Sequence, residues 1–224
     1  MKVTYIDHSG FLVETDCVYY LFDYYKGSLP EMNKEKTVFV LSSHSHHDHY
    51  NSEVFSLLKK LGMEKIRAVL SDDIKEIPEN IEALTVSFGK EYDIGSSRKL
   101  FTFCSTDEGV AFLIEDGGRL IYHSGDLNDW VWDEEDDSYN RQMTENYRKE
   151  IKLLSEKLCG RELDIAFAVL DPRQEKDYDR GLLFFLENVP SKKVYPMHYW
   201  GEPSVIDTFL NDHPEYAAKI QKTE

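Results

Sequence analysis

The stretch TVFVLSSHSHHDHYN, residues 37–51, joins a run of β-branched and aromatic residues to a cluster of histidines. A continuous apolar run of this kind is typical of a strand that is buried on both faces. It therefore predicts a strand over residues 37–43. The cluster begins where that strand ends, and it holds four of the eight histidines in the 224-residue chain.

The spacing within the cluster suits a metal-binding loop. In an extended segment residues two apart share a face, so the side chains of His44 and His46 converge while that of His47 points elsewhere. Asp48 and His49 follow where the chain turns toward a helix. Imidazole and carboxylate groups are ligands for Zn, Fe or Mn. The loop therefore offers four candidate ligands, and the alternative interpretation is a solvated polar loop.

A single loop cannot close a catalytic metal site, so further ligands are expected at other strand ends. Asp126 follows Gly125 at the end of a predicted strand, in YHSGDLN. Its carboxylate could bridge two metal ions. His198 also ends a predicted strand, in YPMHYW. Taken alone, a histidine among aromatic residues is usually a hydrogen-bonded core residue, but together with the cluster we expect His198 to be a ligand.

Charge and cysteine content limit the partners and the cellular location that we expect for this protein. The formal net charge is −16, which disfavours binding of nucleic acid because such proteins neutralise phosphates with basic residues. Four acidic residues interrupt residues 1–25, so we expect neither a signal peptide nor a membrane span there, and we predict a cytoplasmic location. Cys17, Cys104 and Cys159 are an odd number at wide spacing, which argues for reduced thiols rather than a disulfide framework.

The remaining pattern alternates between short β-rich runs and amphipathic helical stripes, without repeats or linkers. It predicts one domain over residues 1–224, of the α/β class. The predicted helices cover residues 54–61, 143–158, 178–189 and 203–213. The predicted strands cover residues 3–6, 11–14, 18–22, 37–43, 66–71, 83–88, 99–104, 109–115, 119–125, 163–171 and 193–198. The acidic run DEEDD, residues 133–137, is expected in a solvated loop before the long second helix.

The order of these motifs resembles that of the metallo-β-lactamase-fold hydrolases. Their signature His-x-His-x-Asp-His matches residues 44–49, their later Gly-Asp matches Gly125 and Asp126, and their C-terminal histidine matches His198. The resemblance implies a four-layer αββα sandwich with the metal site at one edge of its two sheets. The segments YIDHSGFLVET (5–15) and YYLFDYYKG (19–27) are also similar to the branch that contains ascorbate-6-phosphate lactonase and phospholipase-D-type enzymes.

One expected ligand is missing from this chain. Two-metal members of the family carry a further histidine before the Gly-Asp hairpin, but here the segment reads FCSTDEGVAF, residues 103–112. Cys104 or Asp107 could replace it, since neutral hydroxyls are poor ligands. The resemblance then implies one position with four ligands and a second, under-coordinated one. The four are Asp48, His49, Asp126 and His198, and the second position has His44, His46 and Asp126. We expect one or two divalent ions, with Zn favoured over Mn or Fe.

The implied chemistry is hydrolysis of an ester, lactone or phosphodiester bond in a small molecule by a metal-activated water. A bound divalent ion lowers the pKa of water to about 7. Asp48 is the candidate catalytic residue, because it could orient or deprotonate that water. The alternative function is a non-catalytic metal-binding or regulatory protein on a degenerate site. The sequence predicts no nucleic-acid or membrane partner and no particular oligomeric state.

Several other residues are candidates for supporting roles. Arg173 follows a buried strand, where its guanidinium could bind a substrate carboxylate or phosphate, or alternatively could form an ion pair with Asp171. Trp130 and Tyr199 could wall a substrate pocket or belong to the core. The resemblance to that branch implies that His8 and Asp23 support the ligands, and the alternative is that both only satisfy turns. As a support, Asp23 would hold a ligand histidine in its tautomer.

Overall fold

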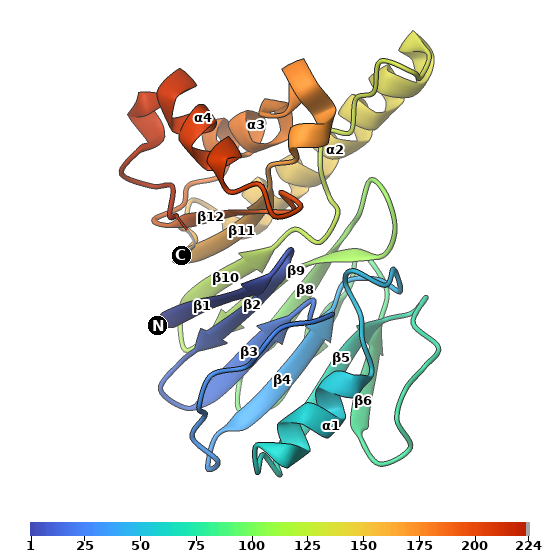
Figure 1. Cartoon of the computed structure of the whole chain (residues 1–224), viewed down its shortest axis with the longest axis vertical. Helices are drawn as coiled ribbons and strands as arrows, with labels where there is room; N and C mark the ends of the chain where they lie inside the picture. The colour runs from blue at the N-terminus through green and yellow to red at the C-terminus, as the bar shows by residue number, and fades with distance from the viewer. Residues whose placement is uncertain (223–224) are drawn as a thin grey trace. The chain divides into compact units, whose positions relative to one another are not determined.

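Two six-stranded sheets carry the fold of this computed structural model, which describes residues 1–222 (Figure 1). Each sheet belongs to one of two units of the chain. The N-terminal unit is Met1–Ser87, and the C-terminal unit begins at Phe88. Both units mix strands with few helices, as the α/β prediction requires. The organisation as one domain stays a prediction.

The N-terminal sheet contains the strands β1 to β6 in sequence order, with one helix between β4 and β5. Its elements are β1 (Lys2–Asp7), β2 (Gly10–Glu14), β3 (Val18–Phe22), β4 (Thr37–Ser42), α1 (Glu53–Lys60), β5 (Ile66–Ser71) and β6 (Glu82–Val86). The first three strands pair antiparallel, and β3 to β6 pair parallel. The strand predicted from the apolar run at 37–43 is therefore β4, in the middle of the sheet.

The helix α1 packs its apolar stripe against one face of this sheet. Val54, Phe55 and Leu58 are buried in a cluster with Val38 and Val40 of β4. The spacing of these helical residues at three and four positions places them on one face of the helix. Burial of this stripe fixes the start of α1, and so fixes the far end of the histidine loop.

Truncating the buried stripe of α1 should destabilise the protein strongly. Leu58 is fully buried, whereas its neighbour Leu57 is only partly buried. We expect Leu58→Ala to lower the free energy of unfolding by about 3 kcal/mol, because it removes buried methyl groups and leaves a cavity. Leu57→Ala should cost about 1 kcal/mol. Urea titration measures both, and equal losses would contradict this account of the helix.

The C-terminal sheet has the order β12-β11-β10-β9-β8-β7. Its strands are β7 (Glu91–Asp93), β8 (Lys99–Cys104), β9 (Val110–Asp116), β10 (Arg119–His123), β11 (Ile165–Val169) and β12 (Val194–Met197). Its helices are α2 (Asp137–Leu158), α3 (Arg180–Asn188) and α4 (Ser204–Asp212), with the short 3₁₀ helices η1 (Pro172–Asp177) and η2 (Pro214–Tyr216). The helix α2 contacts β8 and α3, and α3 contacts β11.

Strand direction gathers the candidate site residues at one edge of each sheet. In the N-terminal sheet β1, β3, β4 and β5 run in the same direction, so their carboxyl ends share an edge. His8, Asp23 and the histidine loop follow β1, β3 and β4 there. In the C-terminal sheet β8, β10, β11 and β12 share their direction in the same way. The carboxyl edge of parallel strands is the usual position of sites in open α/β sheets.

The structure differs from the sequence expectations mainly at helix starts and short elements. The helix α2 begins at Asp137 rather than near Met143, because Asp136 caps it by accepting from the backbone N–H groups of Ser138 and Tyr139. The end of the acidic run is therefore a cap and a first turn rather than loop. The strand β7 and both 3₁₀ helices were not predicted. Among residues 1–222, no helix has the length and apolar character needed to cross a bilayer.

Candidate metal centre

The carboxylate of Asp23 is the buried anchor of the histidine loop. Asp23 directly follows β3, has no exposed surface and takes a positive φ of 39°. Its Oδ1 accepts from the backbone N–H of Ser43 at 2.7 Å, and its Oδ2 accepts from the Ser43 hydroxyl at 2.7 Å. These two bonds tie the end of β3 to the first residue after β4.

The same carboxylate sets the orientation of two histidines. His49 Nδ1 lies 2.8 Å from Asp23 Oδ2, and because a carboxylate only accepts, Nδ1 must donate. Ser43 Oγ lies 2.9 Å from His44 Nδ1, and since its own proton goes to Asp23, it accepts from His44. Both rings then offer Nε2 as the nitrogen that can bind a metal, as orienting partners of metal-ligating histidines do.

His46 lies beside His44 and His47 points away from it, as the two-residue spacing predicts. The rings of His44 and His46 lie 4.5 Å apart between centroids, and their ligand nitrogens lie within 4.8 Å of each other. The side chain of His47 is 90% exposed, and its Nδ1 is 3.8 Å from Asp48 Oδ1. His47 therefore points away from the other donors.

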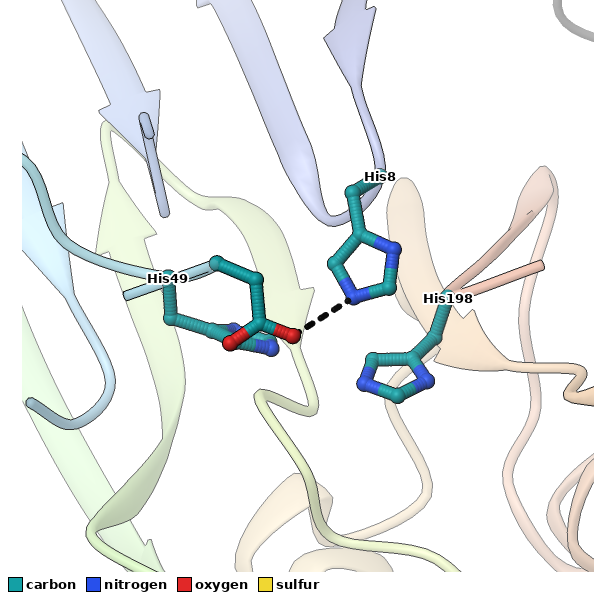
Figure 2. Close-up of side chains that lie close together, drawn as sticks. His8, His49 and His198 are labelled. Carbon is teal, nitrogen blue, oxygen red and sulfur yellow. Dashed lines mark ion pairs between the residues drawn. The ribbon is translucent and has the colours of Figure 1, made fainter. Parts of the chain in front are cut away.

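His8 comes to the same donor set from the turn between β1 and β2 (Figure 2). It is buried and has a φ of 52°. Its Nε2 lies 3.5 Å from Asp48 Oδ2, the contact drawn as a dashed line in Figure 2. His8, Asp48 and His49 each present a donor atom within 4.8 Å of the other two. His8 therefore lies at the distance of a ligand as well as of a supporting residue.

In the C-terminal unit, Asp126 lies in the turn that follows β10, three residues past its end. The indole N–H of Trp130 donates to the Asp126 carbonyl at 2.9 Å. The Thr106 hydroxyl donates to the carbonyl of Asn128 at 2.6 Å and accepts from its N–H at 3.0 Å. The turn is thus held from both sides, and Trp130, which is 5% exposed, is one of the residues that hold it.

His198, also labelled in Figure 2, directly follows β12 and lies between two carboxylates. Its Nδ1 is 2.9 Å from Asp171 Oδ2, and its Nε2 is 3.4 Å from Asp126 Oδ1. Burial lowers the pKa of His198, but the two carboxylates outweigh burial and raise the pKa to about 9. Burial raises the pKa of Asp171, yet the bonds from His198 and Arg173 hold it below its usual value. Sequence reasoning missed Asp171 as the partner of this histidine.

The segment where a further histidine is expected contains both candidate replacements, Cys104 and Asp107. Burial and the nearby Glu150 raise the pKa of the Cys104 thiol. Asp107 is exposed, and its N–H donates to Ser105 Oγ. Between them in the sequence, Thr106 is buried and its hydroxyl donates to backbone carbonyls of the Asp126 turn.

The sequence left two interpretations each for Tyr199 and Arg173, a substrate contact or a structural role. Tyr199 is buried, so its ring belongs to the core. Arg173 makes the ion pair that the sequence left as an alternative, with its Nε 3.0 Å from both carboxylate oxygens of Asp171. The guanidinium is still half exposed, and it lies over the ring of Trp200.

Both donor sets have the chemistry of a metal site. Each unit presents imidazole nitrogens and carboxylate oxygens, which together bind borderline divalent ions. In each unit a buried carboxylate, that of Asp23 or Asp171, fixes a candidate ligand histidine by its Nδ1. Asp48 and Asp126 are nearly buried and lie beside histidine nitrogens. The residues present therefore fit a divalent metal ion.

Comparison with known proteins places the chain in a family. The model described as "Beta-lactamase superfamily domain" matches residues 2–141, more than half of the chain. The chain belongs to the beta-lactamase superfamily. It is 28% identical over 143 residues to a UPF0173 metal-dependent hydrolase from Carboxydothermus hydrogenoformans, covering 56% of this chain and 62% of that protein. It thus spans less than two thirds of that relative's length.

Solved structures of similar fold extend the likeness over nearly the whole chain. Igni18, a metallo hydrolase from Ignicoccus hospitalis, has a TM-score of 0.68 at 18% identity, covering 99% of this chain and 94% of that one. CmlA, a diiron beta-hydroxylase from Streptomyces venezuelae, has a TM-score of 0.63 at 12% identity, covering 99% of this chain and 52% of that one. At such identities the likeness shows the fold alone. The predicted metallo-β-lactamase fold class is confirmed.

The anchoring role of Asp23 in this superfamily member predicts a loss of metal affinity on substitution. Asp23→Asn replaces one acceptor oxygen by an N–H₂ donor, so it loses either the bond from the Ser43 N–H at Oδ1 or the bonds from the Ser43 hydroxyl and His49 at Oδ2. We expect metal affinity, measured by competition with a chelator, to fall about 10- to 100-fold. Asp16→Asn, at an exposed position, is the control. Unchanged affinity in Asp23→Asn would refute the role.

The raised pKa of His198 predicts a pH-dependent stability of the metal-free protein. Because the pKa rises from 6.5 to about 9 on folding, protonated His198 stabilises the fold fully below pH 6.5. That contribution, about 3 kcal/mol, is lost as the pH rises toward 9. Urea titrations between pH 6 and 10 should show the decline, and His198→Gln should flatten it. If the decline in stability with pH persists in His198→Gln, other groups cause it.

Proposed function

We propose that the donor sets of the two units serve one hydrolytic metal centre that acts on a small molecule. The carrying observation is that a buried carboxylate in each unit orients a histidine by its Nδ1, which leaves Nε2 as the nitrogen that can bind a metal. Membership of the beta-lactamase superfamily and the name of the Carboxydothermus relative support the proposal.

The proposed ligands are those expected from the sequence. Six side chains would hold one or two divalent ions, namely His44, His46, Asp48, His49, Asp126 and His198. Zinc is proposed first, with manganese or iron as alternatives, because imidazole and carboxylate donors suit all three. When bound, such an ion supplies a water of lowered pKa and polarises the bond under attack.

The chain's own residues would orient the reaction and move its proton. The Asp48 carboxylate is proposed to accept the proton of the attacking water, and His8 holds that carboxylate in place by its contact at 3.5 Å. Asp171 holds His198, and the Trp130 indole holds the backbone of Asp126. The bond cleaved is proposed to be an ester, lactone or phosphodiester, in a cytoplasmic protein.

A second function has one observation in its favour. In the segment that lacks the expected histidine, the hydroxyl of Thr106 bonds to backbone groups of the Asp126 turn. A non-catalytic metal-binding or regulatory protein could tolerate this arrangement. A hydrolase with one fully coordinated ion could tolerate it as well. Fold does not choose between them, since CmlA, a similar fold, is a hydroxylase.

Substitution of Asp126 tests the hydrolase directly. The wild-type protein should retain at least one divalent ion through gel filtration and should hydrolyse a member of a chromogenic ester and phosphodiester panel. Asp126→Ala should lose bound metal and lower turnover at least 100-fold, because it removes a nearly buried ligand. Asp133→Ala, an exposed carboxylate that pairs with Lys176, is the matched control.

Removal of the metal tests the proposed hydrolase in a second way. Dialysis against a chelator should abolish turnover, and added zinc, manganese or iron should restore it. A protein that binds metal but turns over no panel substrate in a metal-dependent way would favour the binding function. A protein that binds no metal would refute both functions.

A further inference from the structure

A sharp turn after β12 exposes one aromatic ring and buries its neighbour. Trp200 is 43% exposed, whereas Tyr199 is 2% exposed. The backbone φ is 67° at His198, 51° at Trp200 and 76° at Gly201. Residues other than glycine rarely adopt such angles, which persist where surrounding contacts enforce them and which cluster at functional sites. The turn therefore holds the indole of Trp200 outward in a fixed position.

Arg173 is the contact that enforces this position. Its guanidinium carbon lies 4.7 Å from the ring centroid of Trp200 and 6.0 Å from that of Trp132. Its Nε edge pairs with Asp171, the carboxylate that orients His198. A planar guanidinium can pair by its edge and stack by its face at the same time. One side chain thus fixes both the proposed ligand histidine and the exposed indole.

The indole also lies directly beside the imidazole of His198. Their ring centroids are 5.7 Å apart at an interplanar angle of 87°. A substrate ring attached next to a bond that reacts beside His198 would therefore lie close to Trp200. Trp130 and Trp132 are stacked on each other with centroids 5.8 Å apart, and Trp130 is nearly buried. Trp200 offers the more accessible surface of these aromatic side chains.

We propose that Trp200, backed by Arg173, is the subsite that binds a planar ring of the substrate. This rests on the proposed hydrolase function and names its substrate class as esters, lactones or phosphodiesters that carry an aromatic or heteroaromatic ring next to the scissile bond. Such rings stack on indole with little dependence on their identity. Arg173 is a positioning residue. It acts on the substrate ring through Trp200 and on the metal centre through Asp171.

Two phosphonates that differ only in a ring test the subsite. Phenylphosphonate and ethylphosphonate are not hydrolysed, and both offer the same anionic group to a metal. On metal-loaded wild-type protein, calorimetry should give a dissociation constant about tenfold lower for phenylphosphonate. In Trp200→Leu that preference should fall below about twofold, while ethylphosphonate binding and metal content stay unchanged. Trp200→Phe, which keeps an aromatic face, should retain most of it.

Phe88→Leu is the matched control, because Phe88 is an exposed aromatic side chain of the same unit that is 57% exposed. This variant should keep the wild-type preference. A preference that is absent in wild-type protein, or unchanged in Trp200→Leu, overturns the subsite. Turnover and metal content are measured on the same preparations. If the protein holds metal and turns over substrate but shows no preference for phenylphosphonate, only the subsite is refuted. If it neither holds metal nor turns over substrate, the proposed function is refuted.

Discussion

A buried carboxylate holds a histidine by its Nδ1 in each unit of the chain. Asp23 holds His49 in the N-terminal unit, and Asp171 holds His198 in the C-terminal unit. Both carboxylates are completely buried, where an unpaired charge would be costly. The pairing offsets that cost, and it also fixes which nitrogen of each ring is presented as a donor. In each unit the other candidate ligands lie near that unit's pair.

Strand direction explains why the pairs form at all. Asp23 and the histidine loop follow β3 and β4, which are parallel neighbours, so the two segments leave the sheet at the same edge. Asp171 and His198 follow β11 and β12, which are likewise parallel neighbours. Hydrophobic burial sets the register of the strands, and the register brings the polar residues together. The apolar run of β4 therefore contributes to the site as much as the histidines do.

The sequence predicted the elements whose pattern is periodic, and it indicated candidate ligands whose spacing is distinctive. It predicted β4, α1 and the donor types of the loop, because apolar runs and two-residue spacing have direct structural meaning. It could not predict which aromatic residue after His198 is exposed. That choice depends on the positive φ angles of residues 198, 200 and 201, where no strand or helix period applies. The roles of Asp171 and Thr106 also arise from contacts between distant segments, which one sequence alone does not reveal.

We propose that ligands from both units bind one metal ion. Crystals grown with zinc and measured at the zinc absorption edge test it most directly. The account predicts an anomalous peak bound at about 2.0–2.1 Å by Nε2 of both His49 and His198. A zinc ion held by the residues of one unit alone, or no ordered zinc at either histidine, would contradict it.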